Sequence, residues 1–406
     1  MSAPRTAAKA APPKQRRALS NVGGRVRTHG DPRLSALFAH ALERTAIEAP
    51  DAGTHGFHAW PARMHWALPA TILGELGVAG KRVLDPFAGG GTVLVEAMRA
   101  GARGSGIDLN PLSSLVVEVK CSLRTPAEGR RFLESVADVA EASLDRVQTR
   151  TPAKAPLSRE QAMLYGGHIL KELAGLLEEI DQCEDVRDQR AMRAVFSSLL
   201  VKLSKKKADT SEEVVDKRLR KGLSTELFVR KSGELVQRWA ELRMHAPKDA
   251  EEPRLFVGDA RRAPEILGKA YRADLVMTSP PYGGTYDYVA HHALRLAWLG
   301  LPDRDFSRSE LGARRSLRGE EAQQRFDREV LEMLGALRRV MKDDALAVIV
   351  IGDAELGRLR ISPIDQLDAL APRAGLRLIA GASEEKADFR GGIPREEHVL
   401  ALVATR

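Results

Sequence analysis

The sequence predicts an α/β protein with a doubly wound, mainly parallel sheet and an inserted helical subdomain. Short apolar runs bounded by Gly, Pro, Asp or Asn alternate with longer segments of helical periodicity. Repeated alternation of strand and helix is typical of a parallel sheet that helices cover on both faces. The alternation stops over about residues 125–250, where one helical pattern follows another without a convincing strand.

Seven strands and the helices between them follow from this pattern. The last two strands are joined by a short link, which predicts that one of them runs antiparallel at the sheet edge. The predicted strands are 82–85, 105–108, 254–259, 273–278, 345–353, 376–380 and 398–403, and helices are predicted over 92–100, 111–123 and 327–341. The predicted organisation is an arm (1–53), a sheet domain (54–124 and 251–406) and the helical subdomain (125–250).

The composition limits where the protein works. Of its 406 residues 43% are hydrophobic, and two are cysteines, Cys121 and Cys183. Two cysteines are too few for a disulfide scaffold or a four-cysteine zinc site. The sequence contains neither a run of about 18 apolar residues nor the apolar core of a signal peptide. These features predict a cytoplasmic protein that does not enter a membrane.

The positive charge is concentrated in three places. Residues 1–34 hold eight Lys and Arg against one Asp, which accounts for seven of the eight net charges. With its Ala, Pro and Gly content, this region predicts a basic, largely disordered N-terminal arm over 1–53. Residues 202–231 carry ten basic against five acidic residues, and 304–318 carry five against two. Each of these segments is either a solvated face or a contact for a polyanion.

A glycine-rich loop follows the first predicted strand. Residues 84–97 read LDPFAGGGTVLVEA, with three glycines between strand and helix. Glycines permit positive φ angles and let a ligand approach the backbone, and the start of a helix supplies N–H donors. The spacing differs from the Gly-x-Gly-x-x-Gly dinucleotide fingerprint, and no lysine follows as in a phosphate-binding loop. The alternative is an ordinary tight turn.

Carboxylates at two later strand ends indicate a nucleoside ligand. Asp108 lies 17 residues after Gly91, where a carboxylate can accept both hydroxyls of a ribose. Asn110 precedes a proline and is suited to cap the next helix, which leaves Asp108 for the ligand. Asp259 ends another strand and can reach an adenine amino group. A nucleoside cofactor without a pyrophosphate fits this set, and S-adenosylmethionine is that cofactor.

A second motif, Ser279-Pro280-Pro281-Tyr282, ends the predicted strand 273–278. Paired prolines stiffen the chain and leave carbonyl acceptors without competing N–H donors. Hydrogen bonds from an exocyclic amino group to the Pro280 carbonyl and the Ser279 side chain favour a more nucleophilic nitrogen. Tyr282 then stacks on the base, which must leave its helix to be reached. The alternative is a plain turn at a strand end.

Together the two motifs resemble the amino-methyltransferases that modify DNA bases at an exocyclic nitrogen. In that family an Asp-Pro-Phe-x-Gly-x-Gly loop binds S-adenosylmethionine, and a (Ser/Asp/Asn)-Pro-Pro-(Tyr/Phe) tetrapeptide holds the target amino group. The resemblance covers about residues 54–124 and 254–406, which implies a Rossmann-like fold, and Ser279 resembles the cytosine-N4 branch. It implies cofactor binding by Asp85, Pro86, Phe87, Gly89, Gly91 and Thr92, and catalytic roles for Ser279, Pro280, Pro281 and Tyr282.

An upstream segment resembles the element of this family that closes over the methionine end of the cofactor. The resemblance implies that its core, Trp60-Pro61-Ala62-Arg63, holds the cofactor carboxylate. The neighbouring histidines at positions 55, 58 and 65 are an alternative metal cluster, but acidic residues that would complete it are not adjacent, and we expect no metal. His291 and His292 are expected close to the target pocket.

Competing classes are less consistent with the motifs. Carbon-5 cytosine methylation uses a Pro-Cys thiolate, whereas Cys121 follows Lys120 and Cys183 follows Gln182. Methyltransferases of guanine-N2 in transfer RNA usually carry Asp at the Ser279 position and a separate RNA-binding domain. Protein glutamine methyltransferases typically begin the tetrapeptide with Asn. A non-catalytic binding module would be expected to lose the glycines or the tetrapeptide, and both are intact.

The predicted activity is therefore methylation of an amino group in duplex DNA by direct in-line transfer to a flipped base. Cytosine N4 is favoured, adenine N6 comes second, and an RNA substrate or a binding module are the alternatives. Basic residues within 202–207 and 304–318, with Arg218 and Arg220, are expected to contact phosphates. The sequence leaves open the recognition site, the oligomeric state and any restriction or defence partner.

Overall fold

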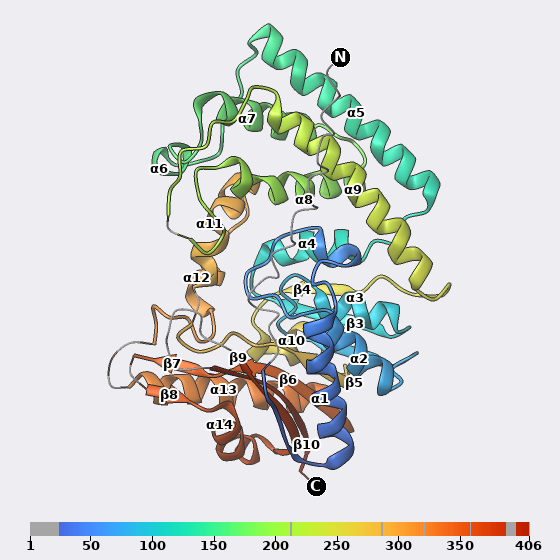
Figure 1. The fold of residues 1–406 in the computed structure, drawn as a ribbon, viewed down its shortest axis with the longest axis vertical. Coiled ribbons are helices and arrows are strands. Elements are labelled where there is room, and N and C mark those ends of the chain that lie inside the picture. Colours follow the sequence, from blue (N-terminus) through green and yellow to red (C-terminus); the bar gives the residue numbers. More distant parts are fainter. Residues whose placement is uncertain are drawn as a thin grey trace, which may run out of the picture.

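The computed structural model describes residues 24–405 except 212, 286, 318, 320, 358 and 387–394. Its centre is an eight-stranded sheet in the order β1-β9-β10-β6-β5-β2-β3-β4 (Figure 1). The strands of this sheet are β1 (Val26–Gly30), β2 (Arg82–Asp85), β3 (Arg103–Asp108), β4 (Arg254–Val257), β5 (Ala273–Thr278), β6 (Met341–Gly352), β9 (Leu376–Lys386) and β10 (Arg395–Ala404). A separate hairpin is formed by β7 (Ala354–Leu356) and β8 (Leu359–Ile361).

The strand directions confirm the predicted doubly wound, Rossmann-like sheet. Strands β4, β3, β2, β5 and β6 are parallel neighbours. Strand β10 is antiparallel, but it lies between β6 and β9 and not at the edge, so that part of the prediction is wrong. The edge position belongs to β1, which pairs antiparallel with β9.

The N-terminal arm is ordered over much of its length, contrary to the prediction of a largely disordered arm over 1–53. Residues 26–47 form β1 and the helix α1 (Pro32–Ile47), and residues 1–23 lie outside the described residues. The side chain of Asp31 caps α1 by accepting from two backbone N–H groups. The helix buries Phe38 and Leu42. Because they are four residues apart, they share one face of the helix. This short apolar pattern was overlooked in the sequence because it adjoins a basic region.

Helices cover both faces of the sheet. One face packs against α1, α2 (Ala67–Glu75) and α3 (Thr92–Arg99), and the other against α10 (Ala263–Leu267), α13 (Ala322–Val340) and α14 (Pro363–Leu370). Along β5, Leu275 and Met277 belong to the first core and Val276 to the second. This alternation follows from the two-residue period of a strand. Short 3-10 turns lie at Gly53–Gly56, Ala260–Arg262 and Pro372–Ala374.

In the chain, the helical segment comes between α4 (Pro111–Lys120) and β4. In space, it lies on one side of the sheet (Figure 1). It contains α5 (Pro126–Thr149), α6 (Arg159–Ala162), α7 (Gly167–Asp181), α8 (Val186–Leu203) and α9 (Leu223–His245). A capping box at Thr125 and Glu128 starts α5. No helix in the described part of the chain is long and apolar enough to span a bilayer.

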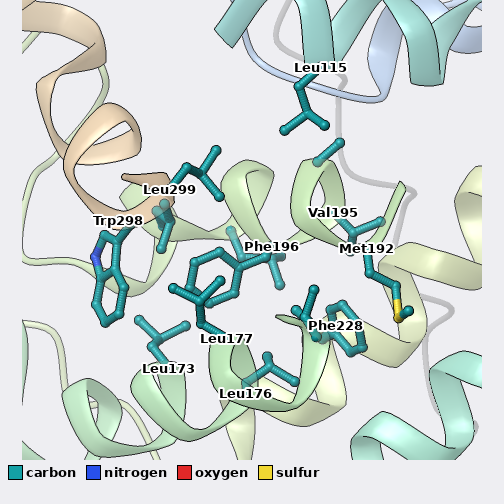
Figure 2. Packing of buried hydrophobic residues seen from close by; sticks show 14 of the residues in the cluster. Leu115, Leu173, Leu176, Leu177, Met192, Val195, Phe196, Phe228, Trp298 and Leu299 are labelled. Atoms are coloured by element: carbon teal, nitrogen blue, oxygen red, sulfur yellow. The ribbon is translucent and has the colours of Figure 1, made fainter. Parts of the chain in front are cut away.

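The core of this segment also includes residues from helices outside it. Phe196 of α8 lies among leucines of α7 and beside Trp298 of α11 (Tyr288–Leu299), and Leu115 of α4 approaches from the opposite side (Figure 2). The rings of Phe196 and Trp298 meet edge to face with centroids 5.6 Å apart. Because α11 follows the Ser-Pro-Pro-Tyr motif, this packing determines where the chain beyond the motif lies.

Replacing Phe196 by alanine tests this packing. Its side chain is fully buried, so Phe196→Ala is expected to lower the free energy of unfolding by about 3–5 kcal/mol. Urea denaturation monitored by circular dichroism measures the change. The matched control is Val186→Ala on the same helix, where the side chain is 67% exposed and a change within about 0.5 kcal/mol is expected. Equal losses in the two variants would contradict the assignment of Phe196 to the core.

Candidate active site

The carboxyl ends of four parallel strands open into one cavity. Asp85 ends β2, Asp108 ends β3, Asp259 follows β4, and Ser279 follows β5. All four line a cavity of about 910 Å³, its open mouth included. In doubly wound sheets, ligands bind at the carboxyl ends of the parallel strands. The rest of the cavity wall is formed by residues from α11, α12 (Arg304–Ser309) and the chain after α12.

Most of the predicted cofactor residues meet at this cavity. Trp60, Pro61, Ala62, Arg63, Asp85, Pro86, Phe87, Gly89, Thr92, Asp108 and Asp259 line it. Gly91 is the exception, because it is the N-cap residue of α3 behind the loop, with a φ angle of 76°. A Cβ atom on Gly91 would lie 2.8 Å from Cγ2 of Val117. Both the positive φ and the close approach explain why glycine stands at this position.

The indole of Trp60 covers the glycine loop. A Cβ atom on Gly89 would lie 3.1 Å from Nε1 of Trp60, and one on Gly90 would lie 3.2 Å from its Cβ and Cγ atoms. Ala62 adopts a φ of 53°, a left-handed conformation that is unfavourable for alanine. Strained backbone of this kind gathers at ligand sites, so this segment is held in a specific shape beside the loop.

Arg63 does not face the cavity with a free guanidinium. It donates to the backbone carbonyls of His55 and Pro50 and pairs with the carboxylate of Asp51 at 2.8 Å. These contacts brace the segment, and the expectation that Trp60-Pro61-Ala62-Arg63 holds the cofactor carboxylate stays a prediction. The cause is local, because three acceptors within 13 residues of Arg63 take three of its five N–H donors.

Asp108 is positioned by two backbone donors. Its Oδ2 accepts from N–H of Gly89 at 2.6 Å, and its Oδ1 accepts from N–H of Asn110 at 2.8 Å. Removal from water raises the pKa of Asp108 to about 6, against the opposing effect of these hydrogen bonds. Each oxygen retains a lone pair, so the carboxylate can still accept ribose hydroxyls.

Asn110 caps α4 as predicted, because its Oδ1 accepts from N–H of Leu112 at 3.0 Å. Its Nδ2 is buried without a hydrogen-bond partner among the described residues, and the residue lines the cavity. A buried donor of this kind fits a polar ligand that supplies an acceptor. Sequence reasoning found the cap but not this free donor.

Asp85 and Asp259 are engaged differently. Asp85 Oδ1 accepts from the hydroxyl of Thr278 at 2.7 Å, which joins the ends of β2 and β5, and burial raises its pKa to about 7. Asp259 instead accepts hydrogen bonds from Nε and a terminal nitrogen of Arg261. The guanidinium therefore contacts both oxygens of the carboxylate that was expected to reach adenine.

A buried lysine beneath the loop was missed by the sequence analysis. Nζ of Lys120 donates to the carbonyl of Gly90, and burial lowers its pKa to about 7. The signal was a lysine on the apolar face of α4, at the end of the run Val116, Val117 and Val119. A long basic side chain on such a face often extends along it until its charged end reaches solvent. Only the fold reveals that the ammonium of Lys120 is buried.

The tetrapeptide divides between two environments. Ser279 and Pro281 line the cavity, whereas Pro280 and Tyr282 are not among the lining residues. The Tyr282 hydroxyl donates to Oε1 of Glu397 at 3.0 Å. Its ring approaches Gly352 so closely that a Cβ there would lie 2.7 Å from a ring carbon. The aromatic ring therefore lies beside the ends of β6 and β10.

The histidines form no common centre. Nε2 of His55 meets Glu96 at 2.7 Å, Nε2 of His58 meets the hydroxyl of Ser197 at 3.0 Å, and His65 contacts a backbone carbonyl. Within the described residues, no three side chains of His, Cys, Asp or Glu are grouped to hold a metal ion. His292 lies at the cavity, with its ring centroid 4.5 Å from that of Trp60.

Comparison with known proteins identifies methyltransferase relatives. No family model matches the chain. It is 24% identical over 267 residues to the type II methyltransferase M.BsoBI of Geobacillus stearothermophilus, covering 58% of this chain and 51% of that protein. It is 24% identical over 242 residues to M.AvaI of a Nostoc species, covering 55% and 49%. It is 33% identical over 89 residues to M.MvaI of Kocuria varians, covering 21% and 19%.

Solved structures with similarity to this chain include TrmN and an rRNA methyltransferase. TrmN from Thermus thermophilus matches 84% of this chain and 49% of its own, at 12% identity and a TM-score of 0.32. The match to the rRNA methyltransferase aviRa from Streptomyces viridochromogenes covers 90% of this chain and 96% of that protein, at 14% identity and a TM-score of 0.34.

The relatives confirm the resemblance to amino-methyltransferases that the two motifs predict. The chain is a methyltransferase relative with a Rossmann-like fold, and S-adenosylmethionine is the cofactor to fit to this cavity. The chain spans about half the length of the first two relatives. The cavity fits this cofactor, because it combines a carboxylate for the ribose with a buried amide that has no partner among the described residues, beside a glycine loop at the start of a helix.

The pKa of Asp108 predicts how cofactor binding depends on pH. As the pH falls through about 6, Asp108 takes up a proton and loses an acceptor for the ribose. We expect the dissociation constant of S-adenosylhomocysteine to rise several-fold between pH 7.5 and 5, measured by isothermal titration calorimetry. Asp108→Asn should bind weakly and lack the step near pH 6, although a component near pH 7 from Asp85 remains. An unchanged step near pH 6 in this variant would exclude the role of Asp108.

Proposed function

We propose that the protein transfers a methyl group from S-adenosylmethionine to an exocyclic amino group in DNA, most favourably N4 of cytosine. The observation that carries this proposal is that Ser279 and Pro281 line the same cavity as Gly89, Asp108 and Asp259. Residues of the cofactor motif and of the amino-group motif therefore line one cavity. The names of the relatives, type II methyltransferases, support DNA as the substrate.

The residues of the cavity suit in-line transfer. When bound, S-adenosylmethionine supplies a methyl group activated by a positively charged sulfur. Asp108 and the glycine loop would hold the nucleoside part, while Ser279 and the carbonyl of Pro280 would accept hydrogen bonds from the target amino group. The chemistry supplied would be in-line transfer, in which the amino nitrogen would bond to the methyl carbon as the carbon–sulfur bond breaks and the amino proton would leave to solvent. Positioning accounts for most of the rate, because no covalent enzyme adduct is needed.

The target base is proposed to leave the duplex and lie beside Tyr282. Its hydroxyl bond to Glu397 and its packing against Gly352 hold the ring in place. A fixed aromatic ring offers a stacking surface to a base without losing side-chain freedom on binding. Serine at position 279 favours cytosine over adenine within the family that the motifs resemble.

A basic loop next to α11 supports contact with a nucleic-acid backbone. Residues 204–222 join α8 to α9, and Asp209 within them pairs with Arg295 of α11. Lys202, Arg218 and Lys221, at or near this loop, are exposed. Lys217 differs, since its Nζ donates to the carbonyl of Lys206 at 2.7 Å and supports the loop itself. The helical subdomain (125–250) is thereby proposed to bring phosphate-binding residues to a catalytic domain made of 54–124 and 251–406.

Product analysis tests the proposal directly. Methyl-labelled S-adenosylmethionine is incubated with unmodified duplex DNA or transfer RNA, and the nucleosides are analysed by mass spectrometry. We expect N4-methylcytosine from DNA. N6-methyladenine would contradict the inference from Ser279 but keep the substrate. Label in RNA alone, or measurable cofactor binding without any label, would overturn DNA methylation by this chain and favour an RNA enzyme or a binding module.

Two variants separate the roles within the cavity. Ser279→Ala removes an acceptor for the target amino group, so it should reduce the methylation rate at least tenfold and change S-adenosylhomocysteine affinity less than twofold. Asp108→Ala should mainly weaken S-adenosylhomocysteine, by tenfold or more, because it removes the ribose acceptor. Single-turnover rates at saturating cofactor and calorimetric titration measure the two effects. Equal loss of cofactor affinity in both variants would contradict this division.

A further inference from the structure

His292 combines complete burial with unsatisfied hydrogen-bonding groups. It lies on α11, its side chain is fully buried, and neither Nδ1 nor Nε2 has a hydrogen-bond partner among the described residues. Buried polar groups in folded proteins are almost always hydrogen-bonded, so an exception requires an explanation. Because His292 also lines the cavity, a bound ligand can supply a partner for one of these nitrogens.

The neighbours of His292 place it near one end of the cofactor. Its ring lies against the indole of Trp60, with centroids 4.5 Å apart and planes inclined by 42°. That indole covers Gly89 and Gly90, so His292 lies just beyond the glycine loop and its covering residue. The Trp60 segment resembles the element that closes over the methionine end, and three N–H groups of Arg63 already donate to acceptors of the protein.

The chemistry of a neutral imidazole matches this end of the cofactor. Neutral histidine has one N–H donor and one nitrogen acceptor. The amino-acid end of S-adenosylmethionine has a carboxylate, which accepts, and an ammonium, which donates. Burial and the nearby charge of Arg295 hold the pKa of His292 well below its usual range, so the ring remains neutral.

We propose that His292 is a cofactor-binding residue whose ring N–H donates a hydrogen bond to the carboxylate at the amino-acid end of S-adenosylmethionine. The proposal rests on the proposed function only in requiring that this cofactor occupies the cavity. It adds a residue of α11, the helix after the tetrapeptide, to the contact that the resemblance assigns to Trp60-Pro61-Ala62-Arg63. Cofactor and target recognition are then joined in one continuous stretch of chain.

Two ligands that differ in the amino-acid end provide the test. S-adenosylhomocysteine carries this end, and 5′-methylthioadenosine lacks it. Calorimetric titration of the full chain without DNA measures both. In His292→Phe we expect S-adenosylhomocysteine to bind at least tenfold more weakly and 5′-methylthioadenosine to stay within twofold. His292→Gln, which keeps a donor and an acceptor, should recover part of the loss, and His292→Leu should repeat it if the phenylalanine variant does not fold.

The matched control is His29→Phe, which changes another imidazole with a buried, unpartnered Nε2, located on β1 away from the cavity residues. It should leave both affinities unchanged. Equal weakening of the two ligands in His292→Phe, or of neither, would overturn the proposal. Failure of the unaltered protein to bind S-adenosylhomocysteine would overturn the proposed function as well, whereas binding without methylation of DNA would overturn only the proposed function.

Discussion

The site depends on keeping ionisable side chains out of water around a short glycine loop. Three ionisable side chains contact residues 86–91 or the strand ends that flank them: Asp85, Asp108 and Lys120. Burial raises the pKa of the two carboxyl groups and lowers that of the lysine, so that all three lie at about 6 to 7. A buried charge is tolerated only when hydrogen bonds replace its water. The backbone of the loop provides these bonds, so the loop and the groups that support it stabilise one another.

The helical segment contributes to the site through α11. Trp298 and Leu299 of α11 are buried in the core of that segment, while His292, on the same helix, reaches the cavity. One wall of the cavity is therefore positioned by residues more than 100 positions earlier in the sequence, such as Phe196. Because protein interiors are close-packed, the core of the helical segment and the cavity wall share one rigid element, α11.

The predictions that held depended on local signals. Strands 82–85 and 273–278 coincide with β2 and β5, and Asn110 caps α4. The errors arose where distant residues decide. Strand β1 exists because its backbone pairs with β9, about 350 residues away, and β10 takes an interior position because it pairs with β6 and β9 on both sides. A local pattern carries no information about such partners.

The sequence by itself determined the class of sheet, the two motifs and the cofactor they suit, since periodicity, glycines and prolines act within a few residues of chain. Tertiary structure alone decided which polar groups remain available to a ligand. It places the hydroxyl of Thr278 on Asp85 and the carbonyl of Gly90 on Lys120, and it leaves His292 without a hydrogen-bond partner among the described residues. The physical reason is that a hydrogen-bonding group takes whichever partner the fold brings within about 3 Å, and the fold sets these distances between residues far apart in sequence.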